Sequence, residues 1–182
     1  MLEKGVIFLV IFFAALLQLS LFSNLFFLGV SPNLMLILVI FWTVHEGFEG
    51  AFFKIIFVGF MLDLFSFQPI GTNIFILTAI AFFADSFIKR FLVAAKNWRT
   101  AILIFLITAS TLICELVLYA LSKAGGYFKL AEIDNIIFTL NDAVLAKKIL
   151  VNVLFFFLIS FPLIKIEQFL NLRKNRKNLN YV

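Results

Sequence analysis

Long apolar runs, separated by short polar or glycine-containing stretches, dominate the chain. About 20 apolar residues in a helix are enough to cross the ~30 Å hydrocarbon core of a bilayer. The pattern therefore predicts an all-α fold, a polytopic membrane bundle of six transmembrane helices. The predicted segments are 5–28, 32–44, 51–67, 70–88, 100–121 and about 146–164.

The second segment is short for a membrane span. Residues 32–44 would form a helix of about 20 Å, less than the ~30 Å core. Either it spans with help from flanking residues, or it forms a hairpin with 51–67 that does not cross fully; we favour two short spans. Ser31 is expected to cap this helix, with Pro32 in its first turn, and Gly47 and Gly50 to mark the following turn.

Composition explains why lipid must cover this protein. Hydrophobic residues make up 64% of its 182 residues, and 27 of them are Phe. A soluble domain of this length is nearer half apolar. We expect one membrane domain over 1–170, with an outer loop at about 122–145, and a basic cytoplasmic tail at 171–182. The N-terminal run has no small-residue cleavage signal, so we interpret it as a retained first span rather than a signal peptide.

The basic residues indicate an orientation. The formal charge is +5, but basic residues border apolar runs, so topology and anionic lipid explain them better than nucleic acid. With both termini in the cytoplasm, most of the 15 Lys and Arg residues fall inside. The exceptions are Lys123, Lys129, Lys147 and Lys148. Because cytoplasmic loops carry excess Lys and Arg, this arrangement predicts a multi-pass protein with both termini cytoplasmic.

Asp63 is the leading candidate functional residue. It lies in an apolar run, and Gly59, Asp63 and Ser66 share one helical face. An ionised carboxylate in hydrocarbon needs a partner, so this face suits contact with another helix. Two interpretations stay open: Asp63 is a polar anchor or ligand site inside the bundle, or it is solvated near the outer interface.

Three further charged residues are candidates for polar groups inside the membrane. Glu115 shares a helical face with Thr108 and Thr111, which predicts that it points into the bundle. If it met Asp63 there, the two carboxylates would need a shared proton or a cation. Asp85 and Lys89 are four residues apart and predict an ion pair along one helix, near the interface.

No enzyme signature accompanies these residues. The run from His45 to Glu49 lacks the second His of a zinc protease helix, and His45 is the chain's one His. Asp63 is not preceded by the Gly-x-Gly of an intramembrane aspartyl protease. The single Cys114 lies in an apolar run and is expected to be a small buried residue. We therefore expect no catalytic residue, no metal and no cofactor.

Several short motifs resemble the MreD family of rod shape-determining membrane proteins. They are Ser31-Pro32-Asn33-Leu34 before the second span, Gly47 and Gly50 at the turn, Gly59-x-x-x-Asp63 in the third span, and Pro69-x-Gly71 before the fourth. The match covers about a quarter of the chain. The acidic residues Glu46 and Glu49 depart from the basic turn expected of that family.

The resemblance implies a function and a set of partners. It implies a non-enzymatic scaffold of the bacterial cell-wall elongation complex in the inner membrane. That scaffold would bind MreC, alongside MreB, RodA and a class B penicillin-binding transpeptidase. The family is also similar to substrate-binding subunits of energy-coupling-factor transporters, so the alternative is a small-solute binding subunit. Helix-packing and partner-binding roles are expected for Pro32, Asn33, Gly50, Gly59, Asp63 and Gly71.

Overall fold

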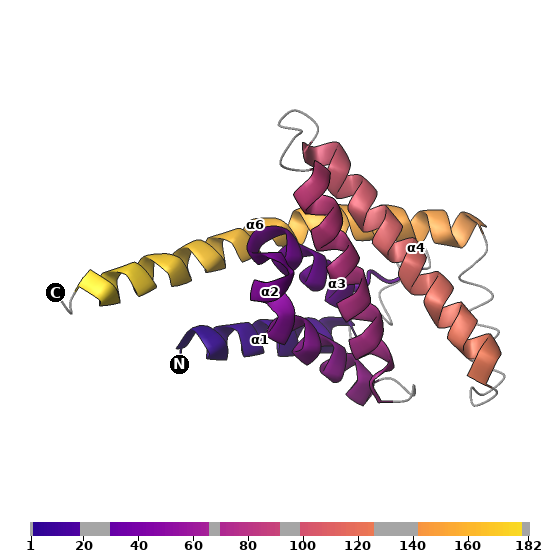
Figure 1. The fold of residues 1–182 in the computed structure, drawn as a ribbon, viewed down its shortest axis with the longest axis horizontal. Helices are drawn as coiled ribbons and strands as arrows, with labels where there is room; N and C mark the ends of the chain where they lie inside the picture. The colour runs from indigo at the N-terminus through magenta and orange to yellow at the C-terminus, as the bar shows by residue number, and fades with distance from the viewer. Residues whose placement is uncertain (1, 19–29, 66–69, 92–98, 126–141, 180–182) are drawn as a thin grey trace.

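Helices form all the regular structure that the computed structural model describes, over residues 2–18, 30–65, 70–91, 99–125 and 142–179. Figure 1 shows α1 and α6 running along the longest axis, with α3 and α4 crossing them obliquely. The helices are α1 (Leu2–Leu16), α2 (Leu34–Phe65), α3 (Thr72–Phe91), α4 (Arg99–Gly125) and α6 (Asp142–Leu179). The all-α prediction is confirmed for this part of the chain.

The second and third predicted segments are joined in α2, which differs from the turn expected between them. Gly47 interrupts α2 with φ 74° and ψ 172°, and the halves 34–46 and 48–65 take different directions (Figure 1). A positive φ suits glycine because a Cβ would be strained there. One glycine is therefore enough to redirect the helix, and no separate loop forms.

The first half of α2 forms the centre of the molecule. Each residue from Leu34 to Thr43 is at most 3% exposed. A helix buried on every side needs no amphipathic pattern, which is why this segment is a continuous apolar run. The first half of α2 is short, as suits a helix that other helices enclose.

Helix boundaries differ from the predictions in three places. Asn33, and not Ser31, caps α2: Asn33 Oδ1 accepts a hydrogen bond from the Leu36 N–H at 3.1 Å. Helix α4 continues to Gly125 and α6 begins at Asp142, so the connection is shorter than 122–145. Helix α6 also continues through the expected tail to Leu179, because Leu, Arg and Lys there are good helix formers. Residues 126–141 of the expected outer loop lie outside the described residues.

Among the residues that the structure describes, two helices are long and apolar enough to cross a membrane, Thr100–Ala120 in α4 and Ala143–Ile166 in α6. A shorter apolar helix covers Gly5–Leu16. Many large apolar side chains are exposed on these and other helices, among them Phe13 at 63%, Phe53 at 82% and Phe83 at 65%. In water such a surface would be costly, and lipid accounts for it. The six-span count stays a prediction.

Candidate functional site

Asp63 caps the start of α3. The backbone N–H of Gly71 donates to Asp63 Oδ2 at 2.8 Å, and the backbone N–H of Asn73 donates to Oδ1 at 2.9 Å. Asn73 Nδ2 also donates to Oδ1 at 2.9 Å. The carboxylate thus satisfies N–H groups at a helix N-terminus, where a negative charge is favoured. At 2% exposure Asp63 is buried, so the solvated interpretation is wrong.

Gly71 and Gly59 support the same junction. Gly71 has φ 101°, a conformation that glycine adopts without strain, and it lets the chain turn from α2 into α3. A Cβ on Gly59 would lie 2.6 Å from the Cα of Ile74. The backbones of α2 and α3 therefore approach closely at Gly59. Its contact lies within the chain, so any effect on a partner would be indirect.

A second polar site joins three helices around Asn152 of α6, which is fully buried. The Asn33 backbone N–H donates to Asn152 Oδ1 at 2.8 Å, and Asn152 Nδ2 donates to Thr111 Oγ1 at 3.1 Å. Pro32, next to Asn33, is also buried. Sequence reasoning missed Asn152, although a lone amide in the apolar run 146–164 carries the signal that identified Asp63.

Glu115 has a partner of opposite charge one helical turn from this network. Glu115 of α4 forms an ion pair with Lys148 of α6, and both side chains are largely buried. Thr111 and Glu115 are four apart on α4, and Asn152 and Lys148 are four apart on α6, so the two contacts lie on facing stripes. The structure does not bring Glu115 and Asp63 together; each has its own partners.

The remaining candidates lie near the α2 kink. Lys89 and Asp85 form an ion pair at 2.7 Å on α3. An added Cβ on Gly47 would stand 3.4 Å from Asp85 Oδ1, so this pair lies beside the kink. Gly50 is exposed, and a Cβ there would stand 3.1 Å from the Cβ of Glu46. The sequence candidates thus occupy three places and not one site.

Two of these places have a common chemistry: at the Asp63 junction and around Asn152 and Glu115, polar side chains connect different helices. Lys89, in contrast, pairs with Asp85 on its own helix. Among the described residues, no three His, Cys, Asp or Glu side chains gather as a metal site would need. Cys114 is buried, 4% exposed, among apolar residues of α4. The arrangement can fix helix positions.

The comparison with protein families gives the identity. Residues 1–168 match the family model of the rod shape-determining protein MreD. The chain belongs to the MreD family. The resemblance inferred from 31–73 is confirmed and extends over most of the chain. No match to the chain was found among the curated proteins or among the solved structures. As an MreD protein with two membrane-capable helices, it is a membrane protein with a role in rod shape.

Proposed function

We propose that this MreD protein is a non-enzymatic scaffold subunit of the cell-wall elongation complex and that it binds MreC. Membership of the MreD family over residues 1–168 carries the proposal. Binding would occur by helix packing in the bilayer. In the larger complex the protein would work alongside MreB, RodA and a class B penicillin-binding transpeptidase.

The use of the buried polar groups supports a scaffold. Asp63 holds the start of α3, Asn152 links α6 to α2 and α4, and Glu115 pairs with α6. In hydrocarbon, such contacts fix the position and rotation of helices. A scaffold needs these fixed positions in order to present a constant lipid-facing surface to a partner helix.

The proposed location is the bacterial inner membrane, with both termini in the cytoplasm. The basic residues favour this orientation. Lys148 is one of the four basic residues that this orientation places outside. Because Lys148 pairs with Glu115, it is not a free positive charge in a loop and counts less against the orientation. The first residues of α1 and the last residues of α6 also lie toward the same end of the molecule (Figure 1).

A cavity gives the alternative, a small-solute binding subunit, some support. It has a volume of about 560 Å³ between α1 and α2, within the roughly 300–1,000 Å³ range of small-molecule sites. Its walls are mainly Ile and Phe, and its charged residues, Glu46 and Lys54, pair with each other. Such walls suit an apolar chain better than a hydrophilic solute.

Complementation tests the proposed function. This chain and the MreC of the same genome would be expressed together in a rod-shaped bacterium depleted of its own MreC and MreD. Rods should return with the pair and not with MreC alone. Spherical cells at normal levels of both proteins would reject the shape function, and growth that depends on an added solute would favour the transporter.

A further inference from the structure

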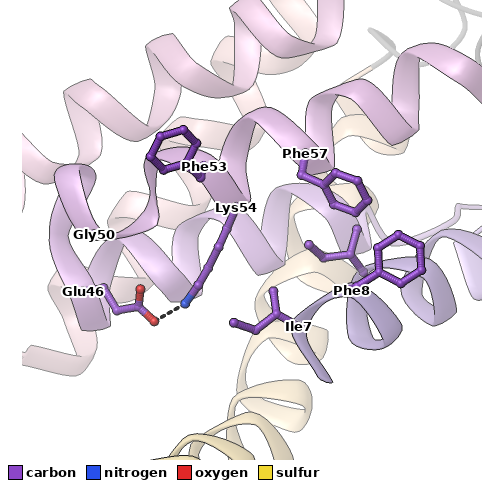
Figure 2. A pocket seen from close by; sticks show the side chains of 8 residues that line it. Ile7, Phe8, Glu46, Gly50, Phe53, Lys54 and Phe57 are labelled. Atoms are coloured by element: carbon purple, nitrogen blue, oxygen red, sulfur yellow. Dashed lines mark hydrogen bonds and ion pairs between the residues drawn. The ribbon is translucent and has the colours of Figure 1, made fainter. Parts of the chain in front are cut away.

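The cavity between α1 and α2 has one charged end and one aromatic end. Figure 2 shows Lys54 extending toward Glu46 at one side of the cavity, while Phe8 and Phe57 face each other at the other. The Phe8 and Phe57 rings are 5.4 Å apart between centroids. Ile7 and Ile11 line the wall from α1.

The position of Lys54 is fixed by two neighbours. Its ammonium pairs with Glu46, and it lies 5.3 Å from the ring centre of the buried Trp42, a cation–π distance. Its side chain is 18% exposed, so the charge is partly withdrawn from solvent. An ammonium group has three donors, so Lys54 can hold Glu46 and a second acceptor at once.

The predicted first span would place the cavity near one surface of the membrane. The apolar part of α1 starts at Gly5, two residues before Ile7. Phe8 and Phe53, which line the cavity, are 47% and 82% exposed. In that placement Lys54 would lie near the headgroup level, with Ile11 and Phe57 deeper along the cavity wall.

We propose that this cavity binds a single phospholipid with an anionic headgroup. The headgroup phosphate would accept hydrogen bonds from Lys54, and one acyl chain would lie against Ile7, Ile11 and Phe57. Lys side chains near a membrane surface attract anionic headgroups, and the phosphate would share Lys54 with Glu46. An apolar partner helix would fill the aromatic end alone, and a free anion the charged end alone, whereas a phospholipid matches both.

Substitutions of Glu46 and Lys54 should change lipid binding in opposite directions. The Glu46 carboxylate competes with the phosphate for Lys54 and repels it, so Glu46→Gln should strengthen binding of an anionic lipid. Lys54→Gln should weaken it, by about fivefold for one basic residue near the headgroup. A loss of folding cannot explain opposite effects from the two members of one ion pair.

Native mass spectrometry of the full chain in detergent tests this. The protein would be titrated with phosphatidylglycerol and with phosphatidylcholine that has the same acyl chains. We expect one phosphatidylglycerol to be retained per chain. Its affinity should rise with Glu46→Gln and fall with Lys54→Gln. Lys165→Gln is the matched control, because Lys165 also lies over a ring, 4.4 Å from that of Phe161, but does not line the cavity.

Three results would overturn the proposal. The first is equal retention of the two lipids. The second is an equal loss with Lys54→Gln and Lys165→Gln, which would mean general surface charge. The third comes from Ile7→Trp, which should fill the cavity and displace phosphatidylglycerol. If that variant instead keeps the lipid and loses MreC, the cavity holds a partner helix.

Discussion

Asp63 shows how one carboxylate can organise a helix junction. Its three hydrogen bonds all come from N–H donors at the start of α3. Asp63→Asn keeps one oxygen acceptor but turns an amide N–H₂ toward a donor. We expect it to lose about 1.5–3 kcal/mol, the range for one hydrogen bond to a charged group, and Asp63→Leu to lose more.

Thermal unfolding of the purified variants in detergent measures this order. The Tm should fall from wild type to Asp63→Asn and again to Asp63→Leu. Glu49→Gln, which changes an exposed acid on the same helix, should leave Tm unchanged. An Asp63→Leu protein as stable as wild type would refute the capping role.

The partners of Asp63 and Lys54 could not be predicted from the sequence, because they depend on turns in the backbone. The helical face of Gly59, Asp63 and Ser66 indicated packing against another helix, and Gly71 indicated a turn. Asp63, however, binds groups eight and ten residues further on, and this contact exists only once the turn has formed. Glu46 and Lys54 are likewise eight apart, and they meet beside the redirected backbone at Gly47.

At the scale of elements, Gly59 sets the distance between α2 and α3. An added Cβ would stand 2.6 Å from Ile74 Cα and 2.8 Å from Ile74 N, and backbone atoms cannot move aside cheaply. Gly59→Ala should therefore cost about 1–3 kcal/mol, as overpacking does. Gly5→Ala is the control, because a Cβ there meets nothing within 4 Å. Equal Tm values for the two variants would contradict the close approach.

The existence of most helices could be predicted from apolar run length alone, but their arrangement could not. Residues 32–44 are short for a membrane span, although the sequence favours two short spans, and burial of 34–43 on every side explains their continuous apolar composition. The start of α2 depends on Asn33, whose backbone N–H donates a hydrogen bond to Asn152 Oδ1 on another helix. Hydropathy along one helix carries no information on such a partner.

The whole molecule has polar contacts between its helices and bulky apolar side chains on its surface. Phe13, Phe75 and Phe83 are each at least 63% exposed, whereas Asp63, Glu115 and Asn152 are each at most 5% exposed. The exposed Phe side chains leave an apolar exterior as the place where a membrane partner can dock. The account therefore rests on MreC recognising a surface that the buried contacts hold in position.

Co-purification with MreC tests that claim most directly. A tagged copy of this chain would be expressed with untagged MreC and recovered from detergent-solubilised membranes. MreC should co-elute with wild type and with Gly5→Ala, and recovery should fall with Gly59→Leu at equal membrane insertion. Absence of MreC from the wild-type eluate, with both proteins present in the membrane, would contradict the account.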